Sequence, residues 1–371
     1  NVYDKKTTDL LMQNRKIPSS TGFSSLSWAN VGEMENKGWE LFFNTNDICK
    51  IGKFSMVVRA NVAQNINRIN EMDPTVLASM NAEFNYTNEN YLSRVQIGNA
   101  LGGIYGFRYK GVYRFDYDHS GYGKNTDYTN TAAAAEAIGD NYTCPVARDA
   151  NGNIIYDANG NPRHMIFNYG GVNYEFQGGD AIYEDINHDG QINELDIVYL
   201  GSSNPKISGG FGFDFKYGRW TLKTNFNFRI GNKIVNMALM KAEDMMYNRN
   251  QATSVNARWR KNGDRTDMPR ALNSAAADGN VYNALASDRY VSSGDYLRFQ
   301  YLQLSYRVPE KFLKKYGLRQ LNISASGNNL IFWSKYSGTD PDHSQSGYGP
   351  TIDDAQTPRS RSFTVSLNVG F

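Results

Sequence analysis

The chain has 371 residues, 40% of them hydrophobic, and its 39 lysines and arginines nearly balance 37 aspartates and glutamates. The resulting net charge of +2 gives no electrostatic basis for binding nucleic acid, and no apolar run is long enough for a transmembrane helix. The two cysteines, Cys49 and Cys144, show no metal-ligand spacing. They argue against a disulfide framework and leave a single bridge open.

The N-terminal part of the chain is expected to contain three strands. Residues 1–14 form a poorly patterned strand, and the polar stretch 17–38 has the composition of a loop. Apolar and polar residues then alternate over 39–46 and again over 54–62, with a short turn around Gly52 between them. This pattern predicts a β-hairpin.

A very long connection, 67–205, follows and is expected to be an insertion with β-like pieces at 80–86 and 103–114. Within it the sequence Asp-Ala-Asn-Gly-Asn occurs twice, at 149–153 and 157–161. Asn-Gly pairs favour type I′ turns. The two copies therefore predict hairpin turns at the surface of the insertion.

The rest of the chain continues with strands and connections. A hairpin with its turn at Gly218 leads into a second long stretch, 231–295, in which 235–248 is expected to form a short helix. Strand 296–308 changes phase near Tyr301, which predicts a bulge or an inward aromatic side chain. A compact basic connection, a strand, a polar loop and a final strand follow at 309–318, 321–333, 336–359 and 361–371.

The final strand separates apolar from polar side chains completely. Successive strand residues point in opposite directions, so one face carries Phe363, Val365, Leu367, Val369 and Phe371. The hairpin around Gly218 repeats this alternation, with lysine, arginine and asparagine on its polar face. A soluble β-sandwich also alternates, so the pattern alone leaves both architectures open.

The order of the connections favours a membrane barrel. Long and short connections alternate, as in outer-membrane barrels with short periplasmic turns and long extracellular loops. We therefore predict an all-β fold, an antiparallel transmembrane β-barrel segment of about eight strands. Its apolar face would contact the lipid bilayer, the C-terminus would be periplasmic, and 67–205 would be extracellular. The side chains expected to face the lumen are Lys223, Asn225, Asn227, Arg229, Gln303 and Arg307. The alternative is a secreted, calcium-stabilised β-sandwich that binds glycans.

The segment 185–196 fits a calcium-binding loop. Oxygen-bearing side chains stand at positions 1, 3 and 5, glycine at 6, a backbone carbonyl at 7, an apolar residue at 8 and an acid at 12. The candidate ligands are Asp185, Asn187, Asp189, Gln191, Asn193 and Asp196. Aspartate at the last position departs from the EF-hand and resembles the dockerin-type loop. We expect a structural Ca²⁺ that stabilises the insertion. The alternative is that these residues only form turns.

No constellation of catalytic residues stands out, so the chain is not expected to be an enzyme. The histidines show no ligand spacing; they are His119, His164, His188 and His343. The neighbouring acids are expected to be solvated loop carboxylates instead of an acid–base pair. These acids are Asp340, Asp342, Asp353 and Asp354.

Several segments spread over nearly the whole chain resemble SusC-like TonB-dependent outer-membrane transporters. Taken together, these segments are specific for that family. They are 30–40 (NVGEMENKGWE), 183–193 (YEDINHDGQIN), 201–211 (GSSNPKISGGF), 294–299 (GDYLRF), 327–330 (GNNL) and the final strand.

The resemblance implies a barrel of about 22 strands with a plug domain, import energised through TonB, a SusD-like lipoprotein lid, and oligosaccharide or peptide substrates. The chain itself accounts for about eight strands and shows no plug domain, TonB-contact segment or leader. We expect residues 1–371 to be the C-terminal portion of such a transporter, which needs the remainder of the transporter and the TonB complex to work.

Overall fold

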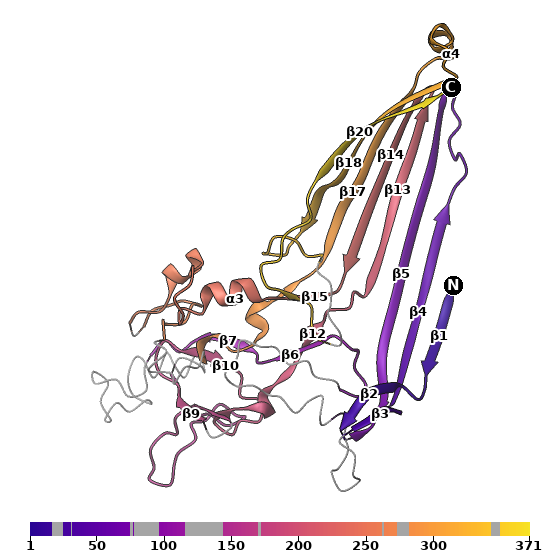
Figure 1. The fold of residues 1–371 in the computed structure, drawn as a ribbon. Helices are drawn as coiled ribbons and strands as arrows, with labels where there is room; N and C mark the ends of the chain where they lie inside the picture. Colours follow the sequence, from indigo (N-terminus) through magenta and orange to yellow (C-terminus); the bar gives the residue numbers. More distant parts are fainter. Residues whose placement is uncertain are drawn as a thin grey trace.

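The computed structural model describes residues 1–16, 25–30, 32–74, 77, 96–115, 144–169, 172–261, 263–272, 282–342 and 349–371. Its main feature is an eight-stranded antiparallel sheet with a body of loops at one end (Figure 1). In spatial order the strands are β1 (Val2–Thr7), β4 (Gly32–Asn44), β5 (Phe54–Met72), β13 (Ile207–Tyr217), β14 (Trp220–Ile230), β17 (Tyr296–Arg307), β18 (Gln320–Ser334) and β20 (Ser362–Gly370). The described strands form an open sheet, because β1 and β20 are its edges and do not pair with each other.

The connections alternate in length, as predicted. The short ones lie at the end of the sheet that holds the C-terminus (Figure 1); they are 45–53, 218–219 and 308–319, the last with α4 (Glu310–Leu313) and η6 (Lys314–Tyr316). The long ones lie at the opposite end and are 8–31, 73–206, 231–295 and 335–361. We call the described parts of the last three, numbered first to third along the chain, the loop body.

Short pairings tie the three connections of the loop body together. β15 (Lys233–Asn236) of the second connection pairs with β16 (Val291–Ser293) of the same connection and, in parallel, with β19 (Ile352–Asp353) of the third. An isolated bridge between Phe107 and Ser287 joins the first connection to the second. The other strands of the loop body are β6 (Gly103–Gly106), β7 (Tyr109–Val112), β8 (Ile166–Tyr169), β9 (Val172–Glu175), β10 (Ala181–Tyr183), β11 (Gln191–Ile192) and β12 (Val198–Ser202). Its helical turns are η2 (Glu194–Asp196), α3 (Met237–Glu243), η3 (Thr253–Ala257), η4 (Tyr282–Ala284) and η5 (Asp288–Tyr290).

The buried hydrophobic clusters of the described residues lie in the loop body and not against the sheet. In the larger cluster, Phe167 and Phe176 of the first connection pack with Tyr282 and Leu285 of the second. A second cluster, which includes Ile104, is centred on β15 and α3. By contrast, apolar side chains of the sheet are exposed; Phe363, for example, is 77% exposed. A second layer of protein, which a β-sandwich requires, is not present among the described residues.

The strand register confirms the predicted faces. Directly paired residues of antiparallel strands share a face, and Phe211 pairs with Phe226, which pairs with Phe299. Their rings are stacked, with centroids 4.9 and 4.5 Å apart. The register shifts between Phe299 and Tyr301, so Tyr301 lies on the polar face. The predicted phase change is therefore a bulge that turns an aromatic residue to that face.

Some predicted boundaries were wrong. The stretch 17–38, predicted as a loop, contains β3 (Ser25–Asn30), which pairs with β2 (Leu11–Lys16), and the beginning of β4. β5 runs to Met72, so the insertion begins six residues later than the predicted 67. In the missed end of β5, polar residues stand on both faces of the strand, so the apolar alternation is lost. Contacts such as Trp39 Nε1 to Gln64 Oε1, 2.7 Å, join this part of β5 to β4.

Other predictions are confirmed or fall outside the described residues. The two Asp-Ala-Asn-Gly-Asn copies form hairpin turns as expected, but the turns are not of type I′, because only Gly152 and Gly160 have a positive φ and the asparagines before them do not. The helix expected within 235–248 is α3. The piece at 80–86 lies outside the described residues, as do His119 and His343. Cys49 and Cys144 are free thiols, so the possible bridge is absent. No helix in the described ranges has the length and apolar character to cross a membrane.

Candidate functional site

The six residues predicted to face a lumen all lie on the polar face of the sheet. Lys223 is paired with Gln303 and Asn225 with Tyr301, so these side chains point to the same side. The strand period places Asn227, Arg229 and Arg307 on that side as well. Of the six, Lys223, Asn225 and Gln303 converge on one hollow, whereas Arg307 lies beside the short turn at the other end of β17.

The hollow exists because β13 carries glycine where its neighbours carry side chains. Gly210 and Gly212 fall on the polar face between β5 and β14. A Cβ atom at Gly210 would come within 2.9 Å of the Asn227 Oδ1. The space left open is about 460 Å³, and its rim includes Phe42, Arg59, Asn61, Lys223, Asn225, Tyr301 and Gln303.

The rim of the hollow combines aromatic rings with amides. Phe42 is 72% exposed although it stands in the polar phase of β4. The side-chain amides of Asn225 and Gln303 make no hydrogen bond with another described residue, so their donors and acceptors are available. Arg59 is paired with Asp214 at 2.5 Å. The hollow therefore offers ring faces, free amides and the Lys223 ammonium, a surface suited to polar oligomers.

A buried ion-pair cluster that the sequence did not reveal closes one end of the polar face. Arg298, only 3% exposed, donates from Nη2 to Asp340 Oδ1 at 2.5 Å. Asp342 bridges Arg229 at 3.1 Å and Arg359 at 2.9 Å. We call Arg298, Asp340 and Asp342 the clamp, because it fastens the third long connection to β17 and β14.

The clamp corrects one prediction. Asp340 and Asp342 are ion-pair partners with side chains withdrawn from water and not solvated carboxylates. Arg229 stays on the polar face, where it is paired with Asp342. Burial by itself raises the pKa of Asp340, but the Asp342 backbone N–H and the Arg298 guanidinium outweigh it and hold the pKa below its ordinary value. Asp353 is also buried and accepts a hydrogen bond from Tyr336 Oη at 2.7 Å.

The calcium-type loop, 185–196, is a compact turn held by its own hydrogen bonds. Gly190 at its sixth position has a φ of 80°, which gives the sharp bend, and its N–H donates to Asp185 Oδ2 at 2.8 Å. Asp189 accepts from the Gln191 N–H at 2.8 Å. Asp196, at the last position, is fully buried and accepts from the Ile186 N–H at 2.8 Å.

Two acids of this loop, Asp185 and Asp196, are partly or fully withdrawn from water. Burial raises the pKa of Asp196 to about 6, and the charges of Asp185 and Asp189 contribute. Burial likewise raises the pKa of Asp185. Desolvated carboxylates that repel one another fit a hard cation such as Ca²⁺. The loop residues fit Ca²⁺ only in part. The acids accept hydrogen bonds from backbone N–H groups. No group of three or more acidic, histidine or cysteine side chains converges as a metal site in the described part of the chain.

Two other candidate ligands have partners of their own. The Gln191 side chain accepts from Asn168 Nδ2 at 2.5 Å, which leaves its backbone carbonyl as the group expected at position 7. Asn193 caps η2, because its Oδ1 accepts from the Leu195 N–H at 2.8 Å while its own N–H donates to Asp196 Oδ2 at 2.9 Å. His188, inside the loop, has a φ of 57°.

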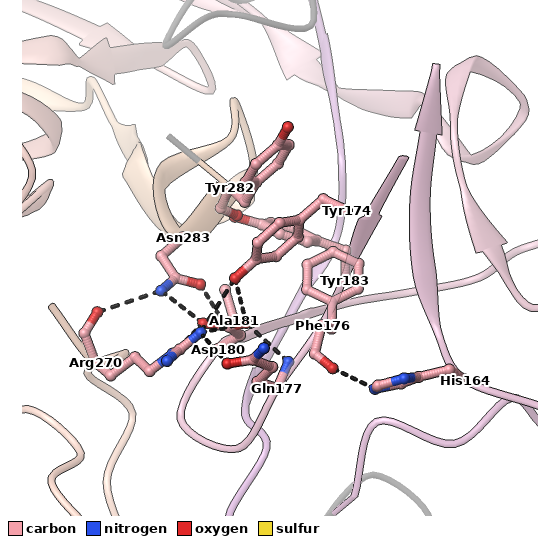
Figure 2. Close-up of polar contacts among 10 residues, drawn as sticks. All are labelled: His164, Tyr174, Phe176, Gln177, Asp180, Ala181, Tyr183, Arg270, Tyr282 and Asn283. Carbon is pink, nitrogen blue, oxygen red and sulfur yellow. Dashed lines mark hydrogen bonds and ion pairs between the residues drawn. The ribbon is translucent and has the colours of Figure 1, made fainter. Parts of the chain in front are cut away.

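A buried polar network centred on Asp180 joins the first and second long connections, as Figure 2 shows. Asp180 Oδ1 accepts from Arg270 Nε at 2.7 Å and from Asn283 Nδ2 at 3.0 Å, and its Oδ2 accepts from Tyr174 Oη at 2.7 Å. Tyr174 is stacked on Tyr282 with ring centroids 4.0 Å apart. Burial, followed by the Asp180 charge, raises the pKa of Tyr174. The network fixes the loop body and provides no catalytic pair.

Comparisons with known proteins give a consistent result. No protein-family model matches the chain. TonB-dependent receptor P39 of Formosa agariphila is 28% identical over 373 residues, which cover 99% of this chain and 33% of the receptor. TonB-dependent receptor P3 of the same organism is 27% identical over 379 residues, covering 100% of this chain and 32% of the receptor. The chain is similar to one third of a SusC-like TonB-dependent receptor.

Solved structures show the same fold. The RagAB peptide transporter matches with a TM-score of 0.64 and 18% identity, over 100% of this chain and 33% of that chain. The RagAB peptide importer in its 'open-open' state matches with a TM-score of 0.62 and 17% identity, over 100% and 32%. The resemblance to SusC-like TonB-dependent receptors seen in the sequence is thus confirmed over the whole chain. These relatives are receptors and transporters, in agreement with the expectation that the chain is not an enzyme.

Proposed function

We propose that the chain forms part of the wall of an outer-membrane, TonB-dependent importer of oligomeric nutrients, either oligosaccharides or peptides. The observation that carries this proposal is the single-layered sheet with an uncovered apolar face. Leu367 is 66% exposed and Phe363 is 77% exposed. A continuous band of this kind is costly in water and suits lipid. The opposite face, with Lys223, Asn225 and Gln303, would then line a wet passage.

The distribution of the connections supports one orientation. Short turns face the periplasm and long loops face the outside in outer-membrane barrels, so the C-terminus would be periplasmic and the loop body extracellular. The buried clusters and the Asp180 network make the loop body a firm surface. In the complete receptor this surface would meet the substrate and a SusD-like lipoprotein lid, and the TonB complex would energise passage.

The hollow on the polar face would contact the oligomer as it passes. Phe42 and Tyr301 offer ring faces, and the amides of Asn225 and Gln303 both donate and accept. Such contacts bind many polar oligomers weakly, which suits a passage that must also release them. Similarity to TonB-dependent receptors and the fold shared with a peptide transporter support this role.

We further propose that the 185–196 loop binds Ca²⁺ as a structural ion. Asp185, Asn187 and Asp189 supply hard oxygen ligands at the required spacing, and the Gln191 carbonyl and Asp196 complete the set. Buried, mutually repelling carboxylates support the proposal. The ion would stabilise the extracellular insertion and take no part in bond making.

Labelling in whole cells tests the orientation with the complete receptor and a bulky, membrane-impermeant maleimide. Cys144 is buried and is replaced by alanine, while Cys49 lies in the short turn 45–53. We expect N159C, at an exposed turn of the loop body, to react in intact cells, and Cys49 to react only after the outer membrane is opened. Reaction of Cys49 in intact cells, or a receptor that stays monodisperse without detergent, would contradict the proposal.

Uptake tests the function itself. Cells that carry the complete receptor are expected to import oligosaccharides or peptides only when TonB is present. A receptor that assembles in the outer membrane and imports no oligomer under any TonB-energised condition would rule out the proposed role.

A further inference from the structure

The end of the sheet that carries the short connections is strongly basic. We call residues 45–53, 216–219 and 307–319 the basic end. They hold nine lysines and arginines and only two acids, whereas the whole chain has a net charge of +2, so the remaining residues are net acidic. These turns lie together at the end of the sheet opposite the loop body (Figure 1). Positive charge is therefore concentrated at one end of the molecule.

The cations of the basic end are exposed and have few acidic partners. Lys50 lies 3.8 Å from Asp47, and Arg307 lies 3.9 Å from Glu310. Exposed pairs of this kind contribute little. The cations within 311–319 are all exposed and form no ion pair with another described residue; they are Lys311, Lys314, Lys315 and Arg319. An anion can therefore reach them without displacing a carboxylate.

A row of aromatic side chains crosses the apolar face directly beside the basic end. Direct strand pairs connect its members in succession; they are Phe54, Tyr217, Trp220 and Tyr306. The ring centroids of Trp220 and Tyr306 are 4.6 Å apart, and Tyr217 is 63% exposed. Aromatic residues gather at the two membrane interfaces of a β-barrel. The row therefore marks the level at which lipid headgroups meet this end of the sheet.

Cations stand immediately beyond this row. Lys53, Arg219 and Arg307 are each the sequence neighbour, on the turn side, of one aromatic residue of the row. The connection 308–319 adds two further rings, because Phe312 is 57% exposed and Tyr316 is 71% exposed. Aromatic rings and long cationic side chains occur together where a protein meets lipid headgroups, since the rings enter the interface and the cations reach the phosphates.

We propose that the basic end binds anionic phospholipids of the periplasmic leaflet, such as phosphatidylglycerol. The cations contact the phosphate, and the aromatic row lies against the acyl chains next to it. Clusters of lysine and arginine beside a membrane attract anionic lipids in this way. A soluble phosphate gains only the charges, whereas a lipid also gains the rings and the apolar face that continues from them. The inference rests on the proposed importer function, because it needs the apolar face in the bilayer and the short turns in the periplasm.

Lipid binding to the purified complete receptor in an uncharged detergent tests this. The probe is a fluorescently labelled phosphatidylglycerol, and its anisotropy reports binding. Unlabelled phosphatidylglycerol should displace the probe, and phosphatidylcholine, which has no net charge, should do so at least about tenfold less well. Glycerophosphoglycerol, the same headgroup without acyl chains, should not compete. Raising the salt from about 0.1 M to about 1 M shortens the Debye length from about 10 Å to about 3 Å, so the preference for phosphatidylglycerol should largely disappear.

Two triple variants locate the surface. K311Q/K314Q/K315Q should weaken phosphatidylglycerol binding at least about tenfold. K241Q/R260Q/K261Q removes three cations from the loop body instead and should leave binding unchanged.

Several results would overturn the proposal. They are equal displacement by phosphatidylglycerol and phosphatidylcholine, displacement by glycerophosphoglycerol, native binding by K311Q/K314Q/K315Q, and an equal loss of binding in both triple variants. The competition and salt measurements use the native receptor, so the test remains valid if K311Q/K314Q/K315Q fails to assemble. The maleimide labelling and the uptake assay involve none of these cations, so failure of lipid binding is distinct from failure of the importer proposal.

Discussion

Removing Arg298 from the clamp should release the third long connection from the sheet. Arg298 and Asp340 are 3% and 5% exposed at the side chain and 2.5 Å apart. The guanidinium also lies over the rings of Tyr296 and Phe332, 5.5 and 5.4 Å from their centroids. Replacing one partner of a buried pair leaves the other charged and unpaired, which costs about 3–5 kcal/mol. R298M should therefore lower the free energy of local opening by about that amount.

Hydrogen exchange of the backbone amides in 335–342 measures this opening. Because about 1.4 kcal/mol is a factor of ten, exchange in R298M should be roughly 100- to 3000-fold faster than in the native receptor. R307M is the matched control in the same strand: its partner Glu310 is 3.9 Å away and both side chains are more than half exposed. Such a pair contributes about 0–1 kcal/mol, so exchange in 335–342 should hardly change.

Two further results decide whether the charge is responsible. The double variant R298M/D340L replaces both partners with apolar groups and should recover much of the protection. The pKa of Asp340 is lowered in the folded protein, so its contribution is present above the ordinary aspartate pKa and is lost as the pH falls through the folded pKa. Protection in the native receptor should thus persist at neutral pH and fail only in acid. An increase of less than tenfold in R298M, or no recovery in the double variant, would refute this reasoning.

Three other predictions concern different parts of the molecule. F226R places a charge on the apolar face and should cost about 2–4 kcal/mol in the membrane, so less of this variant should assemble in the outer membrane. N227R, with its charge on the polar face, should assemble normally. Heat-modified mobility on gels measures the assembled fraction of each variant. Calcium removal by a chelator should speed protease cleavage within 185–196, and D185N should be cleaved quickly with or without Ca²⁺. Equal cleavage of the native receptor with and without Ca²⁺ would contradict the proposed calcium site. D180N leaves Arg270 without its counter-charge and should destabilise the loop body by about 3–5 kcal/mol, measured as faster proteolysis, while D354N, at an exposed pair with Lys241, should not.

The position of each strand residue on one of two faces was predictable because it depends only on a period of two. Phe363 and Leu367 could be assigned to one face without knowledge of any neighbour. The prediction failed where both faces are polar, as in 63–72 of β5, because there the hydrophobic pattern disappears although the backbone ladder continues. The phase change at Tyr301 was visible because a bulge shifts the period itself.

The calcium-type loop could also be proposed from spacing, since its candidate ligands lie within twelve consecutive positions. The clamp could not. Arg298 and Asp340 are 42 positions apart, and nothing near either residue distinguishes a buried partner from a solvated one. The Asp180 pair with Arg270, 90 positions apart, was hidden for the same reason.

Sequence alone thus determined the alternation of faces, the alternation of connection lengths and the family resemblance, because each is carried by neighbouring residues or by their order. Only the tertiary structure decided that the long connections form a body with its own hydrophobic core, and that the side chains of Asp340 and Asp342 are withdrawn from water beside arginines. Burial and charge pairing depend on which distant segments meet, and that follows from the packing of the whole chain.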